Sequence, residues 1–432
     1  AEPLEHAYGG AVRVHGSSLA HFADCEFVNI TTEGSENGGA VRIGASSRVT
    51  FRGCAFTACT SNEGGAVYLD AFSDSEASFT LCTFTRSAAT KNGGAVYAGA
   101  GSRVEFSSCD FLANTATAVD GSSTLYGGGA VYIIAVQGTA LTTANFSKCR
   151  FNENLASKGG GVLVNSADMP NNRMVHTTFA DVNFEFNSAT GWDGDSAAVR
   201  SGDYGGGGVH LKGGEHRFSG VSFRAGNALI GAGMYLEDAS LELVNASLVD
   251  NIAAAEGGGI FVLHSTRLCV NGCAFERNQA NSGAAMHFVD VYGDATNATC
   301  VAVTDTYVVN NTAVGSFARG AGMLIEQGYS RLLDYGSKKA RVCLVRTTFR
   351  ENSVRVISQE STDDLLSSVG GLQRVLSTHS SVMGCGGALT VLVSVKNQIV
   401  TIHTEESVFE HNRAPSGGGI CLSGMTELYD SG

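Results

Sequence analysis

Cysteine is the residue type in this chain with the most evident chemistry, and twelve are present among 432 residues. Six recur in one frame, two residues before a side chain that we expect to point inward: Cys25, Cys54, Cys82, Cys109, Cys149 and Cys273. Equivalent Cβ atoms on strands stacked in register lie about 4.8 Å apart, slightly more than a disulfide usually spans. A ladder of buried thiols is therefore favoured over disulfides for the run from Cys25 to Cys149.

Three further cysteines have different positions. Cys59 occupies the place that Asn takes in other repeats, whereas Cys300 and Cys343 sit at nearly equivalent places in neighbouring repeats and are the disulfide candidates. One Cys per repeat with no adjacent His does not make a set of metal ligands, so we expect no metal site.

The acidic and histidine residues do not show the pattern of a polysaccharide lyase or a glycosidase. Those reactions need paired carboxylates, or acidic calcium ligands with an Arg or Lys base. Asp363 and Asp364 are adjacent but lie in a predicted loop, and the eleven His show no partner spacing. The chain has neither a Ser nucleophile elbow nor the calcium-binding nonapeptide. We therefore expect no enzyme, no catalytic residue and no cofactor, with a lyase or glycosidase as the less favoured alternative.

A row of outward positions could bind a partner. It contains Arg13, Arg42, Tyr68, Tyr97, Tyr132, Leu163, His210, Tyr235, Phe261, His287 and Leu324. Tyr68, Tyr97 and Tyr132 suit stacking on sugars or on the side chains of a partner. The alternative is that these rings only stabilise the contact between repeats. The single Trp, Trp192, lies in a long loop and is a further candidate for partner binding, as is the loop of about 353–384.

These residues are positioned by one repeat, because the block Gly-Gly-Ala-Val recurs thirteen times with small variations. Its first residue never varies: Gly9, Gly38, Gly64, Gly93, Gly128, Gly159, Gly206, Gly231, Gly257, Gly283, Gly320, Gly386 and Gly417. Such constancy predicts a backbone conformation at a corner, with φ > 0, that a Cβ would disfavour. A second block, V-x-F-x-x-C-x-F-x-x-N, follows each copy, and its Asn is expected to form a hydrogen-bonded ladder inside a turn.

Both blocks alternate polar and apolar residues with a period of two, which predicts strands. A unit of 25–31 residues made of short strands cannot bury its own apolar face, whereas stacked units share one continuous core. The sequence therefore predicts an all-β fold, a single parallel β-helix of about fourteen coils over residues 1–432. Loop insertions are expected near 188–204, 324–341 and 353–384. With only 3 Pro in the chain, few ladder hydrogen bonds are interrupted.

The paired motifs GGA[ILV] and F-x-x-N resemble the repeat of the polymorphic membrane proteins, the chlamydial adhesins, over essentially the whole chain. The resemblance implies a right-handed parallel β-helix with surface or adhesive work. The sequence differs from the family pattern in lacking a C-terminal membrane barrel, and we expect it to be part of a longer chain.

Composition narrows the choice of partners. A formal charge of −13 without a basic stripe argues against nucleic acid as a partner. The chain has no run of eighteen apolar residues, so we expect no direct membrane insertion. Twelve cysteines favour a secreted protein, and sequons at Asn29, Asn145, Asn245, Asn297 and Asn310 permit glycosylation. We expect an extracellular or cell-surface scaffold, a structural subunit of a filament resembling a flagellar hair. Its partners would be other protein subunits, further copies of this chain included, or glycans. The alternative is a surface adhesin that binds glycans or a protein receptor.

Overall fold

The computed structural model describes residues 10–32, 37–44, 46–72, 74–117, 126–136, 138–166, 174–190, 205–265, 267–291, 300–327, 339–357, 385–393, 399–424 and 426–430. Every regular element among them is a β-strand, so this part of the chain contains no helix that could cross a membrane. The chain divides into two compact units. Unit 1 holds residues 1–191 and 207–215, and unit 2 holds residues 192–206 and 216–432.

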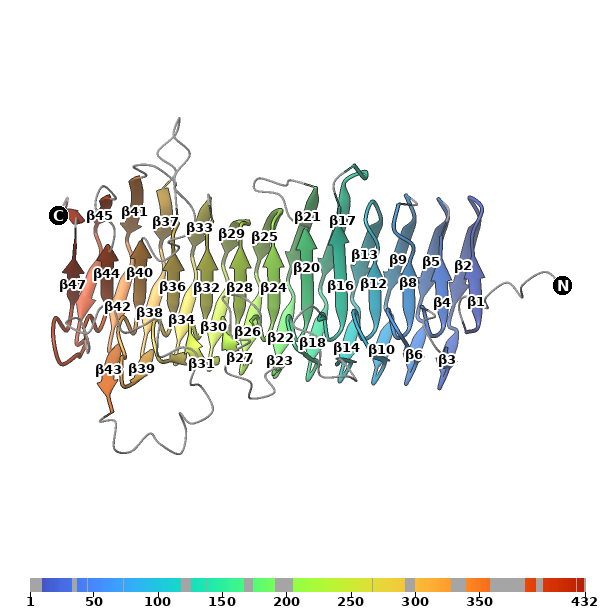
Figure 1. Cartoon of the computed structure of the whole chain (residues 1–432), viewed down its shortest axis with the longest axis horizontal. Helices are drawn as coiled ribbons and strands as arrows, with labels where there is room; N and C mark the ends of the chain where they lie inside the picture. Colours follow the sequence, from blue (N-terminus) through green and yellow to red (C-terminus); the bar gives the residue numbers. More distant parts are fainter. Residues whose placement is uncertain are drawn as a thin grey trace. The chain divides into compact units, whose positions relative to one another are not determined.

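One turn of the chain, here called a coil, is built from four short strands in a fixed order. In the third coil these are β8 (Val67–Leu69), β9 (Glu76–Thr80), β10 (Thr83–Thr85) and β11 (Ala88–Ala89). Alternate side chains of β9 are buried, the period of two expected when one face of a strand lies on the core. Each strand pairs in parallel with its equivalent in the next coil (Figure 1). The protein is a right-handed parallel β-helix, which confirms the predicted fold.

In unit 1, equivalent strands form four parallel sheets, A to D, in chain order. Sheet A contains β1 (Val12–Val14), β4 (Val41–Ile43), β8, β12 (Val96–Ala98), β16 (Val131–Ala135), β20 (Val162–Ser166) and β24 (Val209–Lys212). Sheet B contains β2 (Leu19–Ala23), β5 (Arg48–Arg52), β9, β13 (Arg103–Ser107), β17 (Thr142–Ser147) and β21 (Val175–Ala180). Sheet C contains β3 (Glu26–Val28), β6 (Ala55–Thr57), β10, β14 (Asp110–Leu112), β18 (Arg150–Asn152) and β22 (Asn183–Glu185). Sheet D contains β7 (Thr60–Ser61), β11, β15 (Thr115–Ala116), β19 (Leu155–Ala156) and β23 (Ser188–Ala189).

Unit 2 repeats the arrangement with its own strands. Its sheet A contains β28 (Met234–Glu237), β32 (Ile260–Leu263), β36 (Met286–Val289), β40 (Met323–Gln327), β44 (Leu389–Val393) and β47 (Ile420–Ser423). Sheet B contains β25 (Glu215–Ser219), β29 (Ser240–Val244), β33 (Leu268–Asn271), β37 (Cys300–Thr304), β41 (Lys339–Val345), β45 (Ile399–Glu405) and β48 (Thr426–Asp430). Sheet C contains β26 (Ser222–Arg224), β30 (Ser247–Val249), β34 (Ala274–Glu276), β38 (Tyr307–Val309), β42 (Thr348–Arg350) and β46 (Val408–Glu410). Sheet D contains β27 (Asn227–Ile230), β31 (Ile252–Glu256), β35 (Gln279–Ala280), β39 (Thr312–Gly315) and β43 (Ser353–Val356).

The structure describes only the ends of the three predicted insertions, and these ends contain strands. Ser188–Ala189 is β23, Met323–Gln327 is β40, Lys339–Val345 is β41, and Ser353–Val356 is β43. The central parts, residues 191–204, 328–338 and 358–384, lie outside the described residues. A single domain over 1–432, continuing into a longer chain, stays a prediction.

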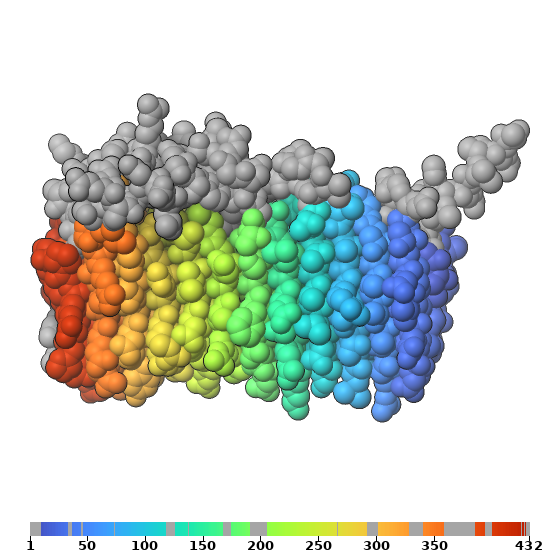
Figure 2. All heavy atoms as spheres, turned by 90° about the horizontal axis from the view of Figure 1, so that it is seen from below, coloured from blue at the N-terminus to red at the C-terminus, as the bar shows by residue number. Residues whose placement is uncertain are grey.

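The core of unit 1 is held by two columns of phenylalanine, one from sheet B and one from sheet C. Ring centroids of Phe51 and Phe79 in sheet B are 4.9 Å apart, and those of Phe56 and Phe84 in sheet C are 4.8 Å apart. The columns meet edge to face, with 5.5 Å between the Phe79 and Phe84 centroids. Such pairs contribute about 0.5–1.5 kcal/mol each beyond the area they bury. Within each unit, atoms of successive coils form adjacent bands in the space-filling view (Figure 2).

The first glycine of each block has the predicted left-handed backbone at every described position. Gly64, for example, has φ +61°, and a Cβ there would lie 2.2 Å from the carbonyl oxygen of Val67. Both the torsion and the close approach exclude a side chain. Gly9 lies outside the described residues.

Two further corners in each coil are made by single residues in the left-handed conformation. In the third coil these are Leu81, between β9 and β10 with φ +56°, and Arg86, between β10 and β11 with φ +53°. The residue after each corner, here Cys82 or Ser87, is buried. The Cys of the second sequence block therefore directly follows the first corner, and the Asn directly follows the second; these two positions are named below by the corner that they follow.

Candidate functional site

The predicted outward row of tyrosines is buried. Tyr68, Tyr97 and Tyr132 retain 9, 7 and 3 % of their surface. Ring centroids of Tyr68 and Tyr97 are 4.6 Å apart, those of Tyr97 and Tyr132 are 5.2 Å apart, and Leu163 extends the cluster. The prediction of an exposed binding row is therefore wrong. The alternative, rings that stack between coils and stabilise the ladder, describes these residues.

The residues that directly precede the first glycine of each block approach this row. Asn37 and Asn92 donate hydrogen bonds from Nδ2 to the two carboxylate oxygens of Glu63, each at 3.2 Å, and so connect three coils. A Cβ on the next residue, Gly38, would lie 3.1 Å from Cβ of Tyr68. Burial raises the pKa of Glu63 and raises that of Tyr132 to about 12.

Among the other predicted binding residues, Trp192 lies outside the described part, as do residues 358–384 of the predicted loop. Of the sequon asparagines, Asn29, Asn145, Asn245 and Asn310 are exposed, whereas Asn297 lies outside the described part. Asn29, Asn245 and Asn310 each form a left-handed corner. Glycosylation of these residues stays a prediction.

The cysteines at the first corner are free thiols, which confirms the predicted thiol ladder of unit 1. Cys109 donates from Sγ to the carbonyl oxygens of Phe79 and Ser107, at 3.4 and 3.5 Å. In unit 2 Cys273 does the same with Leu243 and Asn271, and burial raises its pKa to about 11. These thiols serve as buried hydrogen-bond donors, and the raised pKa of Cys273 makes that thiol a weak nucleophile.

The disulfide-bonded cysteines differ in part from the prediction. Cys343 is in a disulfide, while the side chain of Cys300 lies outside the described part, so their pairing stays a prediction. Cys385 and Cys421, which the sequence analysis did not single out, form a disulfide with a Cα–Cα distance of 5.9 Å. Cys385 directly precedes the first glycine of its block, and Cys421 occupies the outward row of the next coil.

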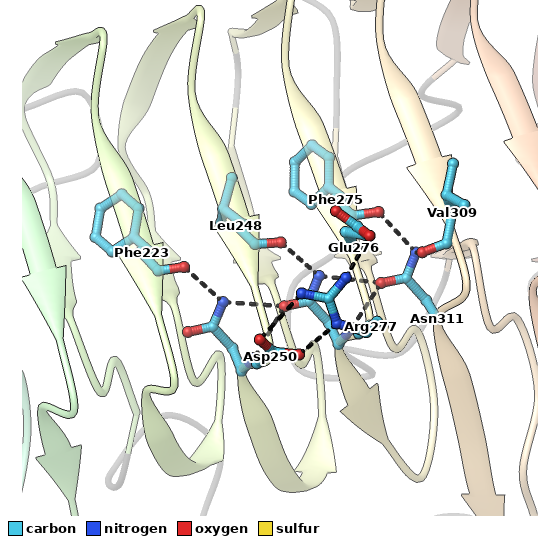
Figure 3. Close-up of polar contacts among 10 residues, drawn as sticks. Phe223, Leu248, Asp250, Phe275, Glu276, Arg277, Val309 and Asn311 are labelled. Carbon is cyan, nitrogen blue, oxygen red and sulfur yellow. Dashed lines mark hydrogen bonds and ion pairs between the residues drawn. The ribbon is translucent and has the colours of Figure 1, made fainter.

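The asparagines at the second corner form the predicted ladder, shown for unit 2 in Figure 3. Asn278 donates from Nδ2 to the carbonyl oxygen of Leu248 at 2.8 Å and to Oδ1 of Asn311 at 3.0 Å. Its own Oδ1 accepts from the backbone N–H of Asn251 at 3.1 Å and from Nδ2 of Asn251 at 2.9 Å. On the surface beside it, Arg277 pairs with Asp250 at 2.8 Å. Each amide thus satisfies backbone groups of the preceding coil.

Among the described residues, the side chains most suited to acid–base chemistry form a buried charged cluster in unit 2. His287 on β36 has no exposed surface and lies between two carboxylates, with Nε2 3.0 Å from Glu326 and Nδ1 3.5 Å from Glu256. Arg319 pairs with the other oxygen of Glu326 at 2.5 Å. The Phe261 ring meets His287 edge-on, with centroids 5.2 Å apart.

The charged side chains of this cluster contact one another and are shielded from solvent. Burial raises the pKa of the Glu256 carboxyl, while the positive charge of His287 would oppose that shift. Oε1 of Glu256 and Nε of Arg319 have no hydrogen-bond partner, an arrangement that costs about 1–3 kcal/mol for each buried group. All four side chains are buried, so a dissolved substrate cannot reach them in this conformation. Among the described residues no set of His, Cys, Asp and Glu side chains is suited to hold a metal ion.

This cluster was not predicted, because its members occupy different positions of the repeat and each position on its own forms a separate row. Glu256 and Arg319 directly precede the first glycines of their blocks, His287 follows Gly283 by four residues, and Glu326 follows Gly320 by six. Alignment of neighbouring repeats on these glycines would have placed the four residues on three consecutive coils. The prediction that the histidines show no partner spacing is therefore wrong for His287.

Comparison with known proteins supports the fold. The family described as "Right handed beta helix region" matches residues 9–195, less than half of the chain and entirely in its N-terminal part. No curated protein and no solved structure matches the chain significantly. The family describes a fold shared by adhesins, pectate lyases and glycosidases.

Proposed function

We propose that this chain is a non-catalytic scaffold at a cell surface, a structural subunit of an extracellular assembly. The observation that carries the proposal is that side chains recurring in the repeat contact the next coil instead of solvent. The Tyr68 row is stacked and buried, and the Asn278 ladder is hydrogen-bonded to the backbone. The side chains that recur in the repeat thus stabilise the scaffold. In this proposal the turns and insertions, which vary between coils, contact the partners.

The disulfides support a location outside the cytosol. Cys385–Cys421 and the disulfide-bonded Cys343 would be reduced in most cytosols and persist in oxidising compartments. The exposed sequon residues at Asn29, Asn245 and Asn310 are compatible with the same location.

Immunogold electron microscopy of cells that produce the protein tests the proposal. We expect label on intact cells, arranged along surface polymers, without permeabilisation. Label that requires permeabilisation would contradict the surface location. A screen of the purified protein against polysaccharides addresses the enzymatic alternative, since release of reducing ends or unsaturated products would overturn a non-catalytic role.

A glycan-binding adhesin is the second candidate function. It is favoured by a polar hollow in unit 1 that Arg48, Asp74 and Glu76 help to line, with the exposed Phe72 on the same turn as Asp74.

A further inference from the structure

The turns between sheets A and B of unit 1 differ in length. Four residues separate β1 from β2 and β4 from β5, whereas six separate β8 from β9. A hollow of about 280 Å³ lies among these turns and the starts of the strands that follow them.

The hollow is lined by groups that can hydrogen-bond to hydroxyls. Four serines, Ser17 and Ser46 among them, line it together with Arg48, Asp74 and Glu76. Hydroxyls donate and accept hydrogen bonds, carboxylates accept them and the guanidinium donates them. The lining therefore offers both the donors and the acceptors that the hydroxyls of a polyol require. The exposed side chain of Leu19 is its one apolar wall.

The charges in the hollow are held in place. Arg48 Nε donates to Glu76 at 2.5 Å, and this bond holds the pKa of Glu76 below its usual value, so that the carboxylate is ionised at neutral pH. The exposed carboxylate of Asp74 makes no side-chain hydrogen bond to any described residue. Since Arg48 and Glu76 compensate each other, Asp74 leaves the hollow with negative charge, which disfavours an acidic ligand.

An exposed aromatic ring stands on the same turn as Asp74. Phe72 has 71 % of its surface exposed and a left-handed backbone with φ +60°, a conformation that is rare for a bulky residue. Its backbone N–H is fixed to the carbonyl oxygen of Ala100 at 2.8 Å.

From these observations we propose that the hollow binds one hexose unit of a neutral glycan. Phe72 would cover an apolar face of the sugar ring, while Asp74, Arg48 and the serines bond its hydroxyls. Stacking of an aromatic ring on a sugar is the chemistry predicted for the tyrosine row, here at a different place. This inference deepens the adhesin candidate, and the binding it describes does not depend on where the protein is located.

Saturation-transfer NMR and calorimetry with the purified chain test the proposal. The probes are the methyl glycosides of glucose, galactose, mannose and N-acetylglucosamine, with methyl glucuronide as the acidic comparison. We expect at least one neutral glycoside to bind with a dissociation constant of about 1 mM, as one sugar unit allows, and the glucuronide to bind more weakly. Phe72→Ala and Asp74→Asn should each lower the affinity about tenfold.

Phe186→Ala is the matched control, because Phe186 is also in unit 1, is 56 % exposed and has φ +53°, but does not line the hollow. It should leave binding unchanged. Absence of binding to all five glycosides, tighter binding of the glucuronide, or equal affinity in the wild type and both hollow variants would overturn the proposal. Sugar binding without surface labelling would overturn the surface scaffold and leave this site intact.

Discussion

Replacement of Asn278 by Ala tests whether the corner amides hold the coils together. The side chain joins three coils through four hydrogen bonds of 2.8–3.1 Å, and it is 1 % exposed. In the Ala variant the Leu248 carbonyl loses its amide donor. The backbone N–H and one amide N–H of Asn251 lose their acceptor.

The magnitude follows from these three groups. A buried polar group that loses its partner costs about 1–3 kcal/mol. Partial relaxation and water entry make the sum smaller than the maximum, so we expect Asn278→Ala to lower the free energy of unfolding by about 3–5 kcal/mol. Asn278→Ser keeps one hydroxyl donor and should lose about half as much.

Urea unfolding followed by circular dichroism measures the effect as a shift of the transition midpoint at constant slope. Asn227→Ala is the control in the same unit, because Asn227 is exposed and makes no side-chain hydrogen bond to the described residues. It should change the free energy by less than about 0.5 kcal/mol. A loss for Asn278→Ala no larger than that of the control would refute the reasoning, as would a Ser variant less stable than the Ala variant.

Three further outcomes are expected. Gly64→Ala should destabilise by about 2–4 kcal/mol in urea unfolding, and Gly16→Ala by only about 1 kcal/mol, because both have positive φ but a Cβ on Gly16 meets no atom within 4 Å; equal losses would contradict the steric part. Burial raises the pKa of Glu256 in the folded protein above 4.5. The protonated carboxyl therefore contributes to the free energy of unfolding below pH 4.5, and this contribution is lost as the pH rises through the pKa of the folded state. Glu256→Gln should therefore gain stability relative to the wild type between about pH 5 and 7, and parallel pH profiles would disprove this. In the native protein a thiol reagent should modify only the half-buried Cys25 and Cys269, and in urea all eight free thiols of the described part; rapid native modification of the others would refute their burial.

The sequence was sufficient for the features that recur in every coil. Thirteen invariant glycines predicted the left-handed corner, since no other residue tolerates a carbonyl as close as that of Val67 is to Gly64. Alternation predicted the strands, and the spacing of Cys109 and Asn114 predicted two buried ladders. These features depend on local backbone geometry and on translation by one coil, and both leave a periodic signal.

Features that depend on contacts between different positions of the repeat were not predictable in this way. Alternation places Tyr97 outside sheet A, but it does not indicate that Glu63 and its neighbours pack over that face. The same contact, from the residue before the glycine to the outward row of the next coil, brings Glu256 to His287 and Cys385 to Cys421. Its chemistry changes from amide to carboxylate to disulfide, so no recurring residue type reveals it.

The first corner also bears on how the coils find their order during folding. In unit 1 five consecutive coils place a thiol there: Cys25, Cys54, Cys82, Cys109 and Cys149. In unit 2 the buried groups at this corner change along the chain: Val221, Ala246, Cys273, Thr306 and Thr347. A strand that skips one coil in unit 1 meets the same partner group as in the native pairing, whereas in unit 2 it meets a group of different size or polarity. Discrimination against misordered coils is therefore weaker in unit 1, and kinetic traps should concentrate there.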